Sequence, residues 1–138
     1  MKIGLIITTY NWIEALNQVL SSIIIQSHLP DEVVICDDGS KIESKNFFLK
    51  IQKNFPCKLK YVWQQDNGFR AASIRNKGIN ELSNDIEYVV IIDGDMILHK
   101  NFIKDHCRLA KNNCFIQGGR AIISKYRTEK LLNRSHIY

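Results

Sequence analysis

The 138-residue sequence predicts an α/β fold with a mostly parallel, doubly wound β-sheet. Strand-like and helix-like segments alternate along the chain from its first residues. The run Y-V-V-I-I-D at Tyr88–Asp93 is short and rich in β-branched residues, which is typical of a strand buried on both faces of a parallel sheet. Polar clusters directly follow three of the strand-like segments, and sheets of this kind bind ligands at the carboxyl ends of their strands.

The expected strands are short apolar runs bounded by polar or turn-forming residues. The first is mostly isoleucine and leucine, and the second reads E-V-V-I-C. The third, L-K-Y-V-W-Q, alternates less cleanly but has high strand propensity. Two further short strands are expected on either side of Gly118-Gly119. In chain order, the strands are expected at Lys2–Thr8, Glu32–Cys36, Leu59–Gln64, Tyr88–Asp93, Cys114–Gln117 and Arg120–Ser124.

The first helix is predicted from apolar residues between Ile13 and Ile24 that recur at intervals of three and four. Asn11 is expected as its N-cap, with Glu14 completing a capping-box-like start. Arg75 falls early in the third helix, where the helix dipole and forked donors favour an anion. The remaining helices are expected at Ser44–Phe55, Phe69–Leu82, Asn101–Ala110 and Thr128–Arg134.

Composition and charge narrow the class of protein. The length fits a single domain covering residues 1–138 and allows a real hydrophobic core. A net charge of +5 is compatible with nucleic acid, anionic lipid or a phosphate-bearing small ligand, but the basic residues are scattered. No apolar stretch is long enough to cross a membrane and no leader segment is visible, so a cytoplasmic protein is expected.

Asp93-Gly94-Asp95 ends the most apolar strand. Residues two apart in extended backbone point the same way, so both carboxylates can face one site. Converging carboxylates repel unless a cation lies between them, and two oxygen ligands suit Mn²⁺ or Mg²⁺ completed by water and a diphosphate. The alternative is a plain Asp-Gly turn.

Four motifs follow one another along the chain: T-T-Y-N at Thr8–Asn11, D-D-G-S at Asp37–Ser40, D-N-G-F-R-A-A-S-I-R-N-K-G at Asp66–Gly78, and D-G-D at Asp93–Asp95. Their order and spacing resemble those of the family-2 glycosyltransferases, which have the GT-A fold and transfer sugars from nucleotide diphosphates with inversion. The third motif is especially similar to the transferase domains of chondroitin-polymerase-type and other bacterial surface-polysaccharide enzymes. The resemblance covers roughly residues 2–124.

The resemblance implies a nucleotide-sugar donor, with a UDP-hexose or UDP-N-acetylhexosamine expected, and Mn²⁺ or Mg²⁺ as cofactor. It implies that Asp93 and Asp95 hold the metal, Asp95 more directly, and that Arg75 helps to hold the nucleotide or diphosphate. A carboxylate suits the nucleoside pocket because it accepts from a uracil N–H or a ribose hydroxyl. The expected substrate-binding residues are Thr9, Tyr10, Asn11, Asp37, Asp38, Arg75 and Asp93.

Inverting transfer also needs a general base for the acceptor hydroxyl. In the family this is a carboxylate well beyond the metal motif, whereas Glu129 is the only side-chain carboxylate after Asp105 here and matches no base motif. The chain is therefore expected to be the donor-binding half of a GT-A domain, lacking most of the acceptor-binding part. The resemblance implies a carbohydrate or glycolipid acceptor in bacterial polysaccharide or lipopolysaccharide synthesis, with peripheral membrane contact and self-association left open.

Two other functions remain as alternatives. A sugar-1-phosphate nucleotidyltransferase has a similar architecture but carries a glycine-rich basic loop after its first strand, and Thr8–Asn11 contains neither glycine nor lysine. A non-catalytic nucleotide- or nucleic-acid-binding module agrees with the net charge. Acidic clusters at the strand ends disfavour a phosphate backbone, so no nucleic-acid partner is expected.

Overall fold

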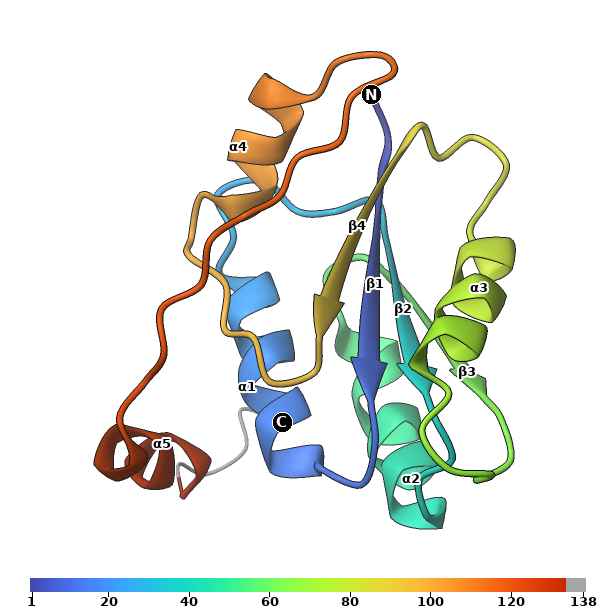
Figure 1. Ribbon diagram of the computed structural model, residues 1–138, viewed down its shortest axis with the longest axis vertical. Helices are drawn as coiled ribbons and strands as arrows, with labels where there is room; N and C mark the ends of the chain where they lie inside the picture. The colour runs from blue at the N-terminus through green and yellow to red at the C-terminus, as the bar shows by residue number, and fades with distance from the viewer. Residues whose placement is uncertain (134–138) are drawn as a thin grey trace.

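The computed structural model describes residues 1–133 and contains a four-stranded parallel sheet with the order β3-β2-β1-β4 (Figure 1). All three strand pairs are parallel, which confirms the predicted α/β class. The carboxyl ends of the strands lie together at one edge of the sheet, which is the lower edge in Figure 1. The strands are β1 at Ile3–Thr9, β2 at Glu32–Asp37, β3 at Lys58–Trp63 and β4 at Tyr88–Asp93.

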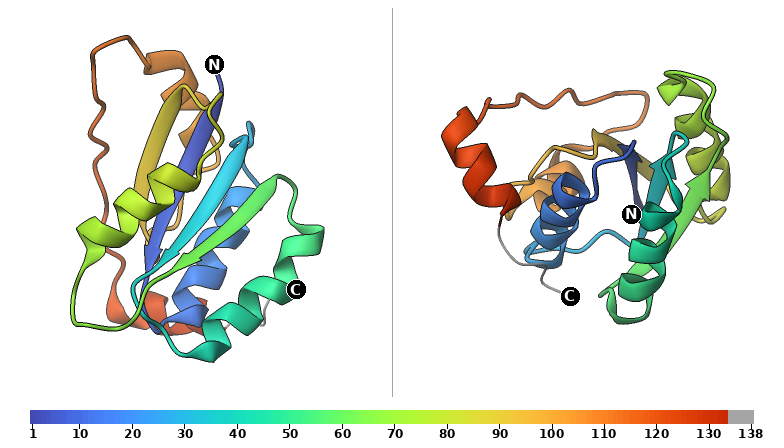
Figure 2. Two further views of the ribbon diagram at one scale, coloured as in Figure 1. Left: turned by 90° about the vertical axis from the view of Figure 1, so that its right-hand side faces the viewer. Right: turned by 90° about the horizontal axis from the view of Figure 1, so that it is seen from below.

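Helices cover both faces of the sheet, as expected for a doubly wound arrangement (Figure 2). Helices α1 and α2 lie on one face, and α3 lies on the other. A short 3₁₀ helix at Gln52–Asn54 continues α2. The α-helices are α1 at Ile13–Ile24, α2 at Ile42–Ile51, α3 at Ala71–Glu81, α4 at Phe102–Leu109 and α5 at Lys125–Leu132.

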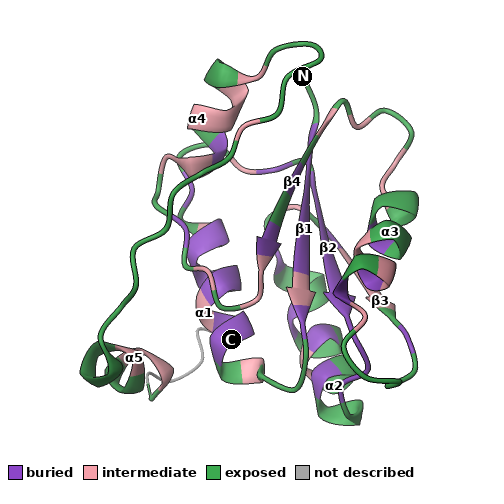
Figure 3. Cartoon of the chain, viewed as in Figure 1, coloured by how far each residue is buried: buried purple, intermediate pink, exposed green. Residues whose placement is uncertain are grey.

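Alternation along β1 divides the core between these two layers. Leu5 and Ile7 are fully buried in the larger cluster with residues of α1 and α2, whereas Ile6 packs in a smaller cluster with Ile74 of α3. Figure 3 shows the buried residues concentrated on the strands and on the side of α1 that faces them. Apolar contacts join the helices on each face to the sheet. The polar residues at the strand ends lie outside these contacts and remain available to form a site.

Strand β4 lies at the edge of the sheet and is not buried on both faces, so that prediction is wrong. Val90 and Ile92 are buried in the larger cluster, but Val89 and Ile91 are 37% and 46% exposed. The reason is that α3 packs on β1, β2 and β3 and leaves the same face of β4 uncovered. The continuous apolar sequence therefore does not distinguish an edge strand from a central one.

The segment between α4 and α5 also differs from prediction. Cys114–Gln117 and Arg120–Ser124 join no strand of the sheet, although both have strand-forming residues. Ile122 is 99% exposed, so the segment gains neither backbone pairing nor burial. The last helix begins at Lys125, earlier than the predicted Thr128–Arg134, and Arg134 lies outside the described residues.

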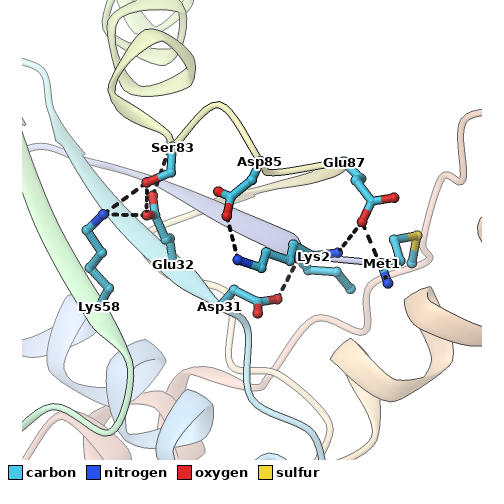
Figure 4. Close-up of polar contacts among 9 residues, drawn as sticks. Met1, Lys2, Asp31, Glu32, Lys58, Ser83, Asp85 and Glu87 are labelled. Atoms are coloured by element: carbon cyan, nitrogen blue, oxygen red, sulfur yellow. Dashed lines mark hydrogen bonds and ion pairs between the residues drawn. The ribbon is translucent and has the colours of Figure 1, made fainter.

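Near the amino ends of the strands, opposite the candidate site, Glu32 is buried to 4% exposure in a polar network (Figure 4). Its carboxylate accepts from Lys58 Nζ at 2.6 Å and from the backbone N–H of Ser83 at 3.0 Å, with Lys60 Nζ at 3.1 Å. Burial raises the pKa of Glu32, but the hydrogen bonds from Lys58, Ser83 and Lys60 outweigh it and lower the pKa to about 2. The network therefore fixes the ends of β2 and β3 while Glu32 is ionised.

Among residues 1–133, no helix combines the length and the apolar character needed to cross a lipid bilayer.

Candidate functional site

A cavity of about 480 Å³ opens at the carboxyl edge of the sheet. Six of the residues predicted from sequence line it together: Thr9, Tyr10, Asp38, Arg75, Asp93 and Asp95. Its other lining residues are Thr8, Trp12, Asp66, Gly68, Phe69, Ala71 and Gly94. The three polar clusters that follow β1, β2 and β4 in the sequence thus converge on one site, as the parallel sheet requires.

On the β4 side of the cavity, Arg75 connects two strands. Its Nη2 donates to Asp93 Oδ1 at 2.7 Å, and its Nε donates to Thr8 Oγ1 at 2.9 Å. Thr8 and Asp93 are register partners on β1 and β4, so one guanidinium group bridges the adjacent strand ends. The other carboxylate oxygen of Asp93 lies 3.9 Å from Nη1 of Arg120.

Gly94 allows the chain to turn sharply after β4. Its N–H donates to the carbonyl of Thr8 at 2.7 Å, and a Cβ at this position would lie 2.8 Å from that oxygen. The turn is closed by Met96 N–H on the carbonyl of Asp93 at 3.2 Å. The Asp-Gly turn is therefore real, and it leaves the exposed Asp95 on the cavity wall.

The carboxylates of Asp93 and Asp95 differ in the contacts that they make with other side chains. Asp93 pairs with Arg75, whereas no hydrogen bond or ion pair within residues 1–133 engages the side chain of Asp95. Nor do the described residues contain a group of three or more His, Cys, Asp or Glu side chains placed to hold a metal ion. The donor set fits a hard divalent cation that takes its remaining ligands from water and phosphate oxygens.

On the β2 side, Asp38 lines the cavity although only 4% of its surface is exposed. Its Oδ2 accepts from the backbone N–H of Arg70 at 2.7 Å, and its Oδ1 accepts from Gln64 Nε2. Each carboxylate oxygen can accept a further hydrogen bond, so these contacts orient Asp38 without using up its capacity. The loop before α3 is thereby fixed to the end of β2.

Asp37 does not line the cavity, and the prediction that it contacts the nucleoside lacks support. It is fully buried, with Oδ1 accepting from the N–H groups of Gly39 and Ser40 at 3.1 and 2.7 Å. Its Oδ2 accepts from the hydroxyl of Tyr61 at 2.6 Å. Burial, followed by this bond to Asp37, raises the pKa of Tyr61. Asp37 therefore shapes the Asp-Gly-Ser turn and leaves its neighbour Asp38 facing the site.

Asn11 has a different role from the predicted N-cap. The cap residue of α1 is Trp12, and no side chain caps that helix. Asn11 has a φ of 45°, donates its N–H to Ser40 Oγ at 2.7 Å, and accepts from the N–H of Lys41 at 2.9 Å. It therefore joins the loops after β1 and β2 and does not line the cavity.

Three aromatic side chains line the cavity and remain accessible. Tyr10, Trp12 and Phe69 are 51%, 42% and 93% exposed. Tyr10 donates its hydroxyl to Asp66 Oδ2 at 2.9 Å, and this hydrogen bond raises the pKa of Tyr10. An exposed phenylalanine on a cavity wall offers a flat apolar surface to a ring-shaped ligand.

Sequence reasoning assigned no role to Trp12, Gln64, Asp66 or Phe69. The signal was present for most of them, because Asp66 and Phe69 fall within the D-N-G-F-R motif and Trp12 directly follows T-T-Y-N. Gln64 carries no such signal, since a glutamine at the end of a strand is ordinary. The exposed Glu129 lies on α5 and is not among the residues that line the cavity.

The fold and the cavity define an α/β protein with a cavity at the carboxyl edge of a parallel sheet, lined by acidic, basic and aromatic side chains. Residues 5–137 match the sequence model described as glycosyl transferase family 2, and the chain belongs to this family. The mostly parallel sheet with flanking helices is that of a GT-A domain, which confirms the fold that the resemblance implied.

Individual relatives cover much of this chain but are far longer. This chain is 29% identical over 141 aligned residues to a chondroitin synthase of Pasteurella multocida, and the alignment covers 98% of this chain and 14% of that protein. It is 32% identical over 95 residues to a hyaluronan synthase of the same species, covering 68% of this chain and 9% of that protein. The structure of S. aureus TarS residues 1–349 in complex with UDP-GlcNAc superimposes with a TM-score of 0.67 at 27% identity, covering 78% of this chain and 30% of that one.

Proposed function

We propose that this chain is the donor-binding part of a metal-dependent, inverting glycosyltransferase that transfers a sugar from a nucleotide-diphosphate sugar to a carbohydrate acceptor. The observation that carries the proposal is the convergence of Asp38, Arg75, Asp93 and Asp95 on one cavity whose wall also holds three accessible aromatic side chains. Acidic groups for a metal, a cation for phosphate and flat apolar surfaces for a base or sugar are the components that such a donor needs.

At one end of the cavity, Asp95 would be the more direct protein ligand of Mn²⁺ or Mg²⁺, because its carboxylate has no other engagement within residues 1–133. Asp93 would contribute its second oxygen, since Arg75 holds its first at 2.7 Å. When bound, the metal neutralises charge on the diphosphate leaving group. The guanidinium groups of Arg75 and Arg120 add positive charge on the same side of the cavity.

The opposite end accommodates the nucleoside. Asp38 is held by Gln64 and Arg70 with acceptor capacity to spare, so it can accept from a base N–H or a ribose hydroxyl. The rings of Tyr10 and Phe69 offer surfaces on which a base or sugar can stack.

The relatives support a particular donor and acceptor class. The TarS structure contains UDP-GlcNAc, which favours a UDP-N-acetylhexosamine or a UDP-hexose as donor. The similarity to chondroitin and hyaluronan synthases favours a carbohydrate acceptor in polysaccharide synthesis. In this proposal residues 1–138 bind the donor as one GT-A unit, and the protein acts in the cytoplasm at the inner face of the cell membrane.

A thermal-shift panel of UDP, GDP, ADP and CDP, each with Mn²⁺ or EDTA, tests the donor class. UDP with Mn²⁺ should give the largest stabilisation, roughly 2.7 kcal/mol when the ligand is at about a hundred times its dissociation constant. The Asp38→Ala variant should bind UDP more weakly even in EDTA, because its defect lies on the nucleoside side. Absence of stabilisation by any nucleoside diphosphate would contradict the proposal.

A further inference from the structure

We propose that Gln64 is a positioning residue that sets the orientation of Asp38 and fixes the loop forming the nucleoside side of the cavity. The inference rests on the proposed function, because it assigns Gln64 a role in a site that holds a nucleotide. Gln64 follows β3 directly, is only 3% exposed and does not line the cavity itself. It therefore acts on the ligand through its neighbours.

The side-chain amide of Gln64 contacts three elements. Its Nε2 donates to Asp38 Oδ1 after β2, and it also lies 3.3 Å from the carbonyl of Arg70 at the start of α3. Its Oε1 accepts from Ser73 Oγ in the first turn of α3 at 3.1 Å. The backbone N–H of Gln64 donates to the carbonyl of Asp37 at 3.2 Å, which holds the residue against β2.

These contacts require both ends of an amide. The Nε2 side faces a carboxylate and a carbonyl, which can only accept, while the Oε1 side faces a hydroxyl that donates. A glutamate would keep the bond from Ser73 but place a second negative charge against Asp38. A leucine or methionine of similar size would leave Oδ1 of Asp38 without its hydrogen-bond donor, although Oδ2 would keep the N–H of Arg70.

Gln64 and Asp38 also control the loop from Gln65 to Arg70, which contributes Asp66, Gly68 and Phe69 to the cavity wall. Asp38 Oδ2 accepts from the N–H of Arg70 at 2.7 Å, so both oxygens of one carboxylate are tied to this corner. Rotation of the Asp38 side chain would break its hydrogen bond to Arg70 and release the end of the loop. It would also turn the carboxylate oxygens of Asp38 away from the nucleoside. The amide thus links the shape of the pocket to the orientation of its carboxylate.

The test is the affinity for UDP of the Gln64→Glu variant, measured by isothermal titration calorimetry in EDTA so that the metal plays no part. At about pH 8, affinity should fall on the order of tenfold relative to the wild type. At about pH 5, Asp38 and the introduced glutamate should share one proton, which restores a hydrogen-bond donor between them. The loss of UDP affinity relative to the wild type should then be smaller than at pH 8. The other ionisable groups near Asp38 include Tyr10, Asp37, Asp66 and Arg70, and they are the same in both proteins.

The Gln26→Glu variant is a matched control. Gln26 is also buried, at 8% exposure, and its amide donates to the carbonyls of Ser22 and His99 while accepting from the N–H of Ile103. This network lies away from the cavity. Its disruption should lower the unfolding midpoint yet leave UDP affinity and its pH profile as in the wild type.

Ser73→Ala provides a milder variant if Gln64→Glu does not fold. It removes only the hydroxyl that orients Oε1, and it should weaken UDP binding by about threefold. Wild-type UDP affinity in both Gln64→Glu and Ser73→Ala, with Asp38→Ala impaired, would overturn this inference and spare the proposed function. Failure of the wild type to bind UDP would instead reject the proposed function.

Discussion

Arg75 of α3 donates a hydrogen bond to Asp93 at the end of β4 across 2.7 Å, although α3 packs on the other three strands. The same guanidinium group holds Thr8 at 2.9 Å. A side chain from one layer therefore fixes the first carboxylate of the Asp-Gly-Asp turn and leaves Asp95 unengaged within residues 1–133. This asymmetry underlies the division of roles proposed for the two aspartates.

Replacing Arg75 with lysine should weaken UDP binding on the order of tenfold in the presence of Mn²⁺, because an ammonium cannot bridge Thr8 and Asp93 with a planar fork. Stability should change by less than about 1 kcal/mol, since the side chains of the ion pair are 34% and 44% exposed. Calorimetry and urea denaturation measure the two effects. Arg108→Lys, at an exposed pair with Asp105, should change neither quantity, and an equal loss of affinity there would contradict the assignment.

Phe69→Ala should reduce the affinity for a UDP-sugar by roughly tenfold, because a stacked ring contributes about 1–3 kcal/mol to binding a base. The fold should be unaffected, since Phe69 is 93% exposed. Phe115→Ala is the matched control, with a phenylalanine 88% exposed outside the cavity. If both variants bind with wild-type affinity, Phe69 does not contact the donor.

Gly78→Ala should destabilise the protein by about 1–3 kcal/mol despite the better helix propensity of alanine. A Cβ on Gly78 would lie 2.1 Å from Sγ of Cys36, where α3 packs on β2. In a Cys36→Ala background the cost of Gly78→Ala should be clearly smaller. Equal costs in both backgrounds, measured by urea denaturation, would show that this contact does not set the spacing of α3.

Glu32→Gln should lower the free energy of unfolding at neutral pH and leave it almost unchanged in acid. The folded-state pKa of Glu32 is about 2, below its ordinary 4.5, so its contribution is complete above pH 4.5 and is lost as the pH falls toward 2. The shift corresponds to about 3 kcal/mol. Denaturation at several pH values should show the wild-type advantage disappear across this range. Glu129→Gln, at an exposed glutamate, should show no such convergence.

The sequence was sufficient for the parallel sheet because most of the strands are short runs rich in β-branched residues, too short for a helix, as Val33–Cys36 illustrates. It was also sufficient to predict that Asp38, Asp93 and Asp95 lie at one edge of the sheet, because parallel strands bring their carboxyl ends together. The sequence alone could not decide between two adjacent residues. Whether Asp37 or Asp38 faces the cavity depends on the turn geometry and on Tyr61, which lies on a different strand.

Long-range partners explain the remaining differences. Val89 and Ile91 have the sequence character of buried residues but lie on an edge strand, because the sheet order depends on contacts between distant segments. Ile122 lies in a strand-like run without a partner edge, and Gln64 gains its role only through Asp38 and Ser73. Local patterns contain none of this information.

In the proposed function, a divalent cation is held jointly by the Asp-Gly-Asp turn and a nucleoside diphosphate. Electron paramagnetic resonance of free Mn²⁺ tests this most directly, with UDP alone, with the wild type alone, and with both together. When Mn²⁺, UDP and protein are all present, the free Mn²⁺ signal should fall well below that of either binary mixture. The extra loss should vanish in Asp95→Asn, whose fold should be intact. An equal loss of signal with Asp95→Asn, or none beyond that caused by UDP itself, would contradict it.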